Sequence, residues 1–183
     1  ARVRAAGDAV GVEGRSVTDA QATVGIAGPV LSRIANFDDF EPLAGEPGVA
    51  LHMVPPGTRL PVDADLIVIP GSKATLADLA FLRDQGWDID IAAHVRRGGA
   101  VLGICAGFQM LGRRVADPMG IEGPPGEAEG LGLLEIDTVL GGDKRLIAVE
   151  GTDRATGEPM RGYEMHVGST TGAARYRPLL DLA

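Results

Sequence analysis

Short runs of apolar residues alternate along the chain with segments in which apolar residues recur at helical spacing. The segment 65–70 is a continuous apolar run rich in β-branched residues, which is typical of a strand buried on both faces. We predict further strands over 23–27, 49–54 and 100–104, and helices over 72–85, 91–97 and 108–114. Strands that alternate with helices predict an α/β fold with a doubly wound, mostly parallel sheet.

The pattern changes after Asp117. Residues 122–132 are rich in Gly, Pro and Glu and are predicted to form a loop, whereas 133–139, 146–149 and 163–167 are predicted to be strands. We expect these strands to form a mixed or antiparallel addition at the edge of the parallel sheet. Residues 1–22 show no periodicity, so we predict a linker or the tail of an upstream domain there and a folded domain over 23–183.

The composition is that of one globular domain. The chain has 183 residues, of which 45% are hydrophobic and 23% are charged, and this balance supplies enough apolar material for a core. The formal net charge is −8 and no run of Lys or Arg exceeds two residues, so we expect neither a nucleic-acid partner nor a membrane partner. No apolar stretch approaches the roughly 20 residues of a membrane span, and the first residues do not resemble a signal peptide. We therefore expect a cytoplasmic protein.

Gly103-Ile104-Cys105-Ala106-Gly107 lies where a predicted buried strand meets a predicted helix. This G-x-C-x-G pattern is typical of a nucleophile elbow, in which small neighbours allow a strained turn to lift the nucleophile above the carboxyl edge of the sheet. The N-terminus of the following helix favours a thiolate at Cys105, and the backbone N–H of Ala106 would point toward the oxyanion of an acyl intermediate. The alternative is that Cys105 is one more small apolar residue that closes a core strand.

A second loop, Pro70-Gly71-Ser72-Lys73-Ala74-Thr75, leaves the preceding strand at the same kind of edge. Its N–H groups are candidates for the other half of an oxyanion hole, and a plain strand-to-helix turn explains the same residues equally well. Thr75 and Asp78 have the spacing of a capping arrangement at the start of the helix. Neither a Walker A motif nor a G-x-G-x-x-G motif after a strand is present, so no nucleotide site is predicted.

Three histidines are candidates for the base that a thiol nucleophile needs. His94 lies among apolar residues of a predicted helix and is more typical of a structural or surface residue, and His52 lies in a strand far from both edge loops. Glu164 and His166 are two residues apart in a predicted strand, so they project from one face and form a candidate Glu–His pair. No His, Cys and Asp cluster has metal-ligand spacing, and we predict no metal site.

Gly103-Ile104-Cys105-Ala106-Gly107-Phe108-Gln109-Met110-Leu111-Gly112 resembles the nucleophile motif of the class I, triad-type glutamine amidotransferases, whose fold is flavodoxin-like. More narrowly, the chain is similar to the CobB/CobQ-type amidotransferases of the cobyric acid synthase family. Three further stretches carry this resemblance, namely 32–40, 70–79 and 162–170. Four motifs in the family's order and at fitting intervals are a more specific signal than the elbow alone.

The resemblance implies a role for each matching residue. Cys105 would attack the side-chain amide of glutamine, release ammonia and leave a glutamyl thioester for water to hydrolyse. Gly71 or Ser72, together with Ala106, would donate the oxyanion N–H groups. Gln109 would contact the glutamine substrate, and the domain itself would need no cofactor.

The resemblance also implies partners outside this domain. An upstream synthetase domain, joined in cis or acting in trans, would bind ATP and Mg²⁺ and consume the ammonia. It would amidate carboxylates b, d, e and g of the corrinoid adenosylcobyrinic acid a,c-diamide on the route to cobalamin. Residues 1–22 would then be a linker or the tail of that synthetase domain.

One motif expected from the resemblance is not in the sequence. The family's catalytic His is expected in a later Gly-Thr-Tyr-x-His-Gly-like motif, which the 183 residues lack. Glu164-Met165-His166 has the reverse order of the His-x-Glu of other class I members. We therefore do not transfer the base role to His166, keep it and Glu164 as weak candidates, and expect the domain over 23–183 to be C-terminally incomplete.

Three other interpretations fit part of the sequence. A glutaminase subunit that serves the amidation of peptidoglycan precursors shares the elbow, but the segment 32–40 favours the cobyric acid branch. A non-catalytic docking domain of the same fold fits the absent base, and the intact thiol argues against it. An unrelated thiol hydrolase on an α/β-hydrolase fold fits the G-x-C-x-G pattern alone.

Overall fold

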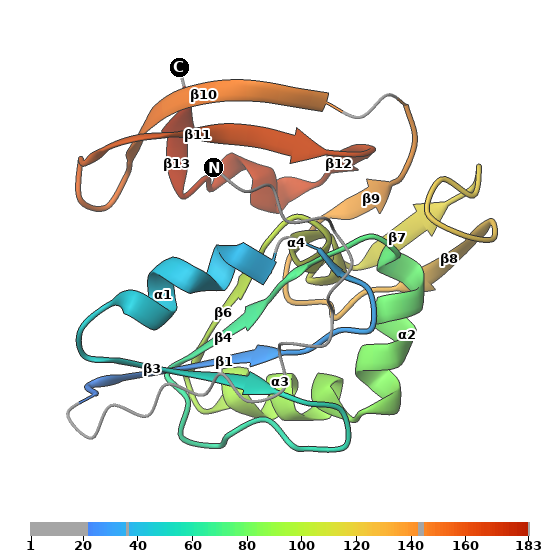
Figure 1. Ribbon diagram of the computed structural model, residues 1–183. Coiled ribbons are helices and arrows are strands. Elements are labelled where there is room, and N and C mark those ends of the chain that lie inside the picture. Colours follow the sequence, from blue (N-terminus) through green and yellow to red (C-terminus); the bar gives the residue numbers. More distant parts are fainter. Residues whose placement is uncertain (1–21, 36, 143–144, 183) are drawn as a thin grey trace, which may run out of the picture.

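The computed structural model describes residues 22–35, 37–142 and 145–182. Its central sheet consists of β1 (Val24–Pro29), β3 (Val49–Val54), β4 (Leu66–Ile69) and β6 (Ala100–Gly103), in the order β3-β1-β4-β6 and with each neighbouring pair parallel (Figure 1). All four strands lie where the apolar runs predict them. The predicted linker or tail over residues 1–22 lies outside the described residues, apart from Ala22.

Helices cover both faces of this sheet, which confirms the doubly wound arrangement. The helices are the 3₁₀ helix η2 (Phe37–Phe40), α1 (Glu41–Gly45), α2 (Thr75–Asp84), α3 (Trp87–Arg96) and α4 (Ala106–Met110). Ile67 and Ile69 of β4 belong to the buried cluster that α2, α3 and α4 complete, whereas Val68 packs in a second cluster with Phe40. Consecutive residues of β4 thus enter opposite cores, which explains its uninterrupted apolar run.

Two helix boundaries differ from the prediction. Helix α3 begins at Trp87 rather than at residue 91, because Gly86 takes left-handed backbone with a φ of 73° and the Trp87 side chain is fully buried in the core. Helix α4 spans Ala106–Met110 rather than 108–114, because the chain enters the next sheet at Arg114. Both boundaries depend on how the chain packs in the folded protein, and the spacing of apolar residues along a helix does not predict this packing.

The second half of the chain forms two further sheets. The mixed sheet consists of β7 (Arg114–Asp117), β8 (Gly126–Glu129), β9 (Asp137–Val139) and β12 (Ser169–Thr171), in the order β12-β9-β7-β8. The antiparallel sheet consists of β10 (Arg145–Asp153), β11 (Pro159–His166) and β13 (Leu180–Leu182), in the order β11-β10-β13. The predicted mixed and antiparallel strands are therefore present, as separate sheets that lie toward the α4 end of the parallel sheet in Figure 1.

Two predictions in this half are wrong in part. Strand β8 lies within the segment 122–132 that the sequence predicts as a loop, because pairing with β7 rather than apolar burial holds it in place. Residues 133–136 precede β9 and are not in a strand. Leu133 and Leu134 instead pack against the core that contains α2 and α3.

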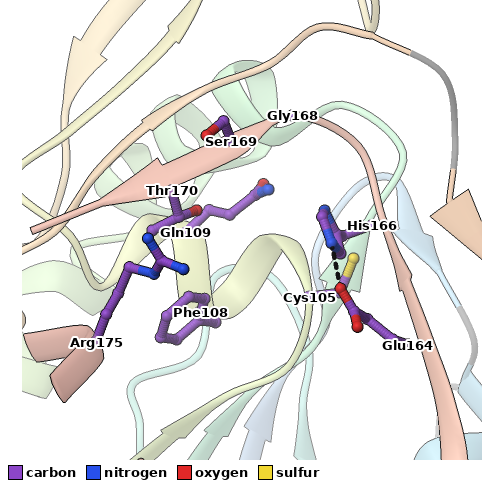
Figure 2. A pocket seen from close by; sticks show the side chains of 9 residues that line it. All are labelled: Cys105, Phe108, Gln109, Glu164, His166, Gly168, Ser169, Thr170 and Arg175. Carbon is purple, nitrogen blue, oxygen red and sulfur yellow. Dashed lines mark hydrogen bonds and ion pairs between the residues drawn. The ribbon is translucent and has the colours of Figure 1, made fainter. Parts of the chain in front are cut away.

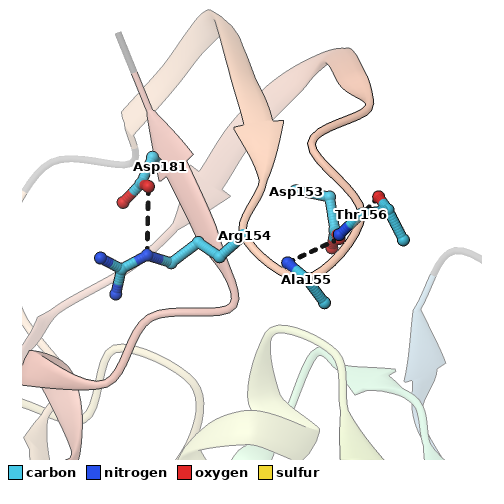
Figure 3. Close-up of polar contacts among 5 residues, drawn as sticks. All are labelled: Asp153, Arg154, Ala155, Thr156 and Asp181. Atoms are coloured by element: carbon cyan, nitrogen blue, oxygen red, sulfur yellow. Dashed lines mark hydrogen bonds and ion pairs between the residues drawn. The ribbon is translucent and has the colours of Figure 1, made fainter.

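A tight turn joins β10 to β11 (Figure 3). The Asp153 carboxylate accepts hydrogen bonds from the backbone N–H of Thr156 (2.7 Å), the hydroxyl of Thr156 (2.8 Å) and the backbone N–H of Ala155 (3.0 Å). These bonds, with the Thr156 N–H foremost, hold the pKa of Asp153 below its ordinary value. Arg154 Nε donates to Asp181 Oδ2 at 3.1 Å and ties the turn to β13. The turn thereby fixes the register in which β11 returns.

Asp117 ends β7 and holds the loop that follows. Its buried carboxylate accepts hydrogen bonds from the backbone N–H groups of Ile121 at 2.8 Å and Glu122 at 2.9 Å. Burial raises the pKa of Asp117, but the backbone N–H groups of residues 120–122 outweigh burial, so the pKa lies below its ordinary value. The backbone N–H groups thus stabilise the charged form of the Asp117 carboxyl relative to its protonated form.

We predict that Asp117 contributes to the acid sensitivity of the fold. A carboxyl whose pKa is lower in the folded than in the unfolded chain adds stability above the unfolded value of about 3.9, and this stability is lost as the pH falls through the folded pKa. In urea titrations between about pH 6 and pH 2, the unfolding free energy of Asp117→Asn should start lower and fall less steeply below about pH 4. The control Asp84→Asn, at the exposed end of α2, removes a carboxylate without these contacts. An Asp117→Asn curve parallel to that of the wild type would contradict the assignment.

Candidate active site

Cys105 occupies a strained turn between β6 and α4. Its φ is 52° and its ψ is −110°, and among the described residues it is the one non-glycine residue with a positive φ. Such backbone is costly for a side chain and persists only where the surrounding structure enforces it. The turn leaves Cys105 exposed while the adjacent Ala106 is buried. The alternative that Cys105 closes a core strand is therefore wrong.

Two glycines make the turn possible. A Cβ atom on Gly103 would lie 2.5 Å from the carbonyl carbon of Gly107, and a Cβ on Gly107 would lie 2.1 Å from the carbonyl oxygen of Ile69. Both approaches are to backbone, which cannot move aside without separating α4 from the sheet. In the same region the Ile104 N–H donates to Ile69 O at 3.0 Å. The small neighbours of the G-x-C-x-G pattern thus serve the close packing that the sequence predicts.

The loop after β4 lies beside the thiol. Strand β5 (Gly71–Ser72) pairs antiparallel with β2 (Ile34–Ala35), so the two segments 32–40 and 70–79 meet at this edge. A Cβ placed on Gly71 would lie 3.6 Å from Cys105 Cβ and 3.6 Å from Ala35 O. A side chain at position 71 would therefore touch Cys105, so the Gly71 loop lies beside the thiol.

Asp78 fixes both of these segments. Its fully buried carboxylate accepts hydrogen bonds from Ser32 Oγ at 2.5 Å and from Ser72 Oγ at 2.6 Å, and Oδ2 also accepts from the Arg33 N–H at 3.1 Å. Hydrogen bonds to a charged acceptor are stronger than those between neutral groups. Asp78 therefore acts from α2 to hold the backbone of the two loops in one arrangement.

The predicted capping arrangement of Thr75 and Asp78 is wrong. Asp78 faces the two loops, as just described, and the Thr75 N–H donates instead to Glu122 Oε2 at 2.7 Å. The Glu122 carboxylate, from another part of the chain, thus accepts a hydrogen bond from a backbone N–H in the first turn of α2. Tertiary contacts have replaced the local cap that the spacing indicates.

A pocket of about 460 Å³ opens above the elbow (Figure 2). Its walls come from α4, from β11 and β12, and from the 3₁₀ helix η3 (Ala173–Tyr176). The residues that line it are Cys105, Phe108, Gln109, Glu164, His166, Gly168, Ser169, Thr170 and Arg175. The exposed thiol therefore lies in a concave site of the size typical of small-molecule ligands.

Glu164 and His166 lie at the Cys105 end of the pocket, as Figure 2 shows. His166 Nε2 is 2.7 Å from Glu164 Oε1, which confirms the predicted pair on one face of the strand. The intervening Met165 has its carbonyl oxygen 3.8 Å from Cys105 Sγ. A Glu–His pair and a thiol are thus combined from segments about 60 residues apart in the chain.

The other two histidines lie away from this site. His94 is buried in α3, with Nε2 at 2.9 Å from Ala100 O, which confirms its structural role. His52 lines a different pocket together with Asp63 and Asp65. That pocket lies at the amino ends of β1 and β4, opposite the sheet edge that carries Cys105.

Gln109 links the elbow helix to the strands above it. The side chain is buried, and Nε2 donates to Val167 O at 3.2 Å, between β11 and β12. The four residues Phe108, Ser169, Thr170 and Arg175 line the same pocket but have no role in the sequence-based hypothesis. Phe108, Ser169 and Thr170 belong to recognised stretches, whereas no sequence signal marks Arg175.

The described part of the chain offers neither a metal-binding cluster nor a helix that could span a membrane. Within residues 22–35, 37–142 and 145–182, no group of three or more His, Cys, Asp or Glu side chains is arranged to hold a metal ion. Among the helices in the same part of the chain, none is long and apolar enough to cross a membrane.

The fold is like that of the glutamine amidotransferases. The PurLQS structure from Thermotoga maritima superposes with a TM-score of 0.61 at 20% identity, covering 82% of this chain and 70% of that one. A crystal structure of a glutamine amidotransferase superposes with a TM-score of 0.54 at 16% identity, covering 80% and 72%. At these identities the superpositions show the fold, and they confirm the predicted fold class.

Sequence similarity identifies the family within that class. The model of the CobB/CobQ-like glutamine amidotransferase domain matches residues 25–183, so the chain belongs to this family. Cobyric acid synthases from a Caulobacter species and from Rhodobacter capsulatus are 57% and 63% identical over 98% and 84% of this chain. The one from Rhizorhabdus wittichii is 60% identical over 93%. This chain covers only 37%, 32% and 35% of the length of these three relatives.

We predict that Gly107 is required for the fold of the elbow. Gly107→Ala places a Cβ on the carbonyl oxygen of Ile69, and it should lower the unfolding free energy by about 3 kcal/mol or prevent folding. The matched control is Gly45→Ala at the end of α1, where a new Cβ meets nothing within 4 Å, and its effect should stay within about 1 kcal/mol. Urea denaturation measures both variants, and equal stability of the two would refute the packing argument.

Proposed function

We propose that this chain is the glutaminase domain of a cobyric acid synthase and that Cys105 is its nucleophile. The observation that carries the proposal is the exposed thiol at a strained elbow, within a pocket and beside the Gly71 loop. Membership of the CobB/CobQ-like amidotransferase family and the 57% identity to a cobyric acid synthase support it. The domain would hydrolyse glutamine to glutamate and ammonia.

The chemistry proceeds in two steps. The Cys105 thiol gives its proton to a base and attacks the side-chain carbonyl carbon of glutamine. As the carbon–nitrogen bond breaks, the base returns that proton to the leaving nitrogen, so ammonia departs and a glutamyl thioester remains. Water then attacks the thioester, releases glutamate and restores the thiol. In each step the carbonyl oxygen becomes an oxyanion, for which we propose the N–H of Ala106 and that of Gly71 or Ser72 as donors. The position of Gly71 beside Cys105, where an added Cβ would lie 3.6 Å from Cys105 Cβ, supports this assignment.

The Glu164–His166 pair is proposed to favour the charged thiolate. A histidine that is hydrogen-bonded to a carboxylate and lies close to a thiol favours the thiolate, which is the form that attacks the substrate. The proton acceptor of the family is expected in a Gly-Thr-Tyr-x-His-Gly-like motif outside this sequence, so the base role of His166 stays a prediction. Gln109 is proposed to contact the glutamine substrate from α4, in keeping with its place in the pocket.

The ammonia would be used outside this domain. We propose an upstream synthetase domain that binds ATP and Mg²⁺ and amidates the b, d, e and g carboxylates of adenosylcobyrinic acid a,c-diamide. Relatives named cobyric acid synthase, which are more than twice as long as this chain, support such an arrangement. Residues 1–22 would be a linker or the tail of that domain, and the amidotransferase domain over 23–183 would be C-terminally incomplete.

The other interpretations have less support. The three relatives quoted above are cobyric acid synthases, which favours the corrinoid branch over the peptidoglycan branch. The amidotransferase-like fold argues against an unrelated α/β-hydrolase. A docking domain without catalysis differs from a glutaminase in one measurable respect, which is turnover of glutamine at Cys105.

We predict that Cys105→Ala abolishes glutamine hydrolysis without unfolding the protein. Loss of the nucleophile should lower kcat for ammonia release by at least about 1,000-fold, while the thermal midpoint stays close to that of the wild type, because the thiol is exposed. The control Val62→Ala truncates a side chain that is 76% exposed and outside the pocket. A Cys105→Ala protein that still hydrolyses glutamine, or one that does not fold, would overturn the assignment.

A further inference from the structure

The pocket above the elbow carries its charges at two ends. The thiol of Cys105 and the Glu164–His166 pair lie at one end, and the guanidinium of Arg175 enters the other, next to Thr170 and Phe108 (Figure 2). Among the described residues that line the pocket, Arg175 alone carries a permanent positive charge. A ligand with its reacting group at Cys105 therefore extends toward a cation.

Within the described part of the chain, the Arg175 guanidinium has no hydrogen-bond or ion-pair partner. Other exposed arginines do pair with carboxylates, as Arg154 does with Asp181 and Arg161 with Glu150. The carboxylate inside the pocket, that of Glu164, is already bonded to His166. The guanidinium is thus available to an anionic group of the ligand.

The segment that carries Arg175 is held in place before any ligand binds. Gly172, just before η3, has a φ of 123°, and a Cβ there would lie 2.1 Å from Glu135 O. Strand β12 on the other side of Gly172 pairs with β9 and is pinned by the Thr138 and Thr170 hydroxyls at 2.9 Å. A fixed backbone lowers the entropy that is lost when the side chain binds a ligand.

We propose that Arg175 binds the α-carboxylate of the glutamine substrate. The inference rests on the proposed function, because it takes the side-chain amide of glutamine to lie at Cys105. A planar guanidinium matches a carboxylate with two parallel hydrogen bonds. A glutamine residue inside a peptide has no free α-carboxylate, so Arg175 selects free glutamine over peptide-bound glutamine. Arg175 is thus a specificity residue at the end of the pocket opposite the nucleophile.

The test is equilibrium binding to the full chain carrying Cys105→Ala, which removes turnover. Isothermal titration should show that adding Arg175→Gln weakens L-glutamine binding by about 10- to 100-fold. L-glutamine α-amide, which lacks the negative charge, should bind weakly and equally to both proteins. The matched control is Arg177→Gln, added to Cys105→Ala in place of Arg175→Gln. Arg177 lies two residues further along the chain and outside the pocket, so its loss should leave the affinity for L-glutamine unchanged.

The outcomes separate this inference from the proposed function. An Arg175→Gln change that leaves L-glutamine affinity intact, or that weakens L-glutamine and its α-amide equally, overturns the role of Arg175 even if the wild type hydrolyses glutamine. Absence of any L-glutamine binding also overturns it. Arg175-dependent binding without hydrolysis by the wild type would support the inference and contradict the proposed glutaminase activity.

Discussion

The close contact of α4 with the end of β4 is the constraint on which the site depends. With glycine at 103 and 107, the chain turns from β6 into α4 so tightly that Cys105 adopts a left-handed φ. The strain is sustained because α4, which follows the turn, belongs to the buried core, where Met110 packs with Ile67 and Ile69. The hydrophobic effect therefore fixes a backbone conformation that an isolated peptide would not maintain.

The walls of the pocket depend on longer-range contacts. Asp78 orients the loop beside the thiol from within α2, and the antiparallel sheet carries Glu164 and His166 over the elbow. The turn at Asp153 sets the register of that sheet, and a shift of one residue would move both side chains to its other face. The thiol thus follows a strand of the parallel sheet, while much of the pocket wall comes from β11, β12 and η3, which are added to that sheet.

The sequence predicts the parallel sheet and the elbow because both are recorded in neighbouring residues. Continuous apolar runs mark strands buried on both faces, and the two glycines around Cys105 mark a turn without space for side chains. The spacing of Asp78 predicts a local cap, and its true partners cannot be predicted because they lie on segments that only the fold brings together. Strand β8 has no apolar pattern, and Arg175 has no motif, so neither is detectable before the sheets are assembled.

The central claim is that Cys105 is a glutamine-directed nucleophile, and covalent trapping tests it most directly. The protein would be treated with diazo-oxo-norleucine, a glutamine-analogue electrophile, and its intact mass and peptide map would be compared with those of the untreated protein. The account predicts a single adduct on Cys105 whose formation L-glutamine slows. A folded protein that gains no adduct, or gains it at another residue, would contradict the account.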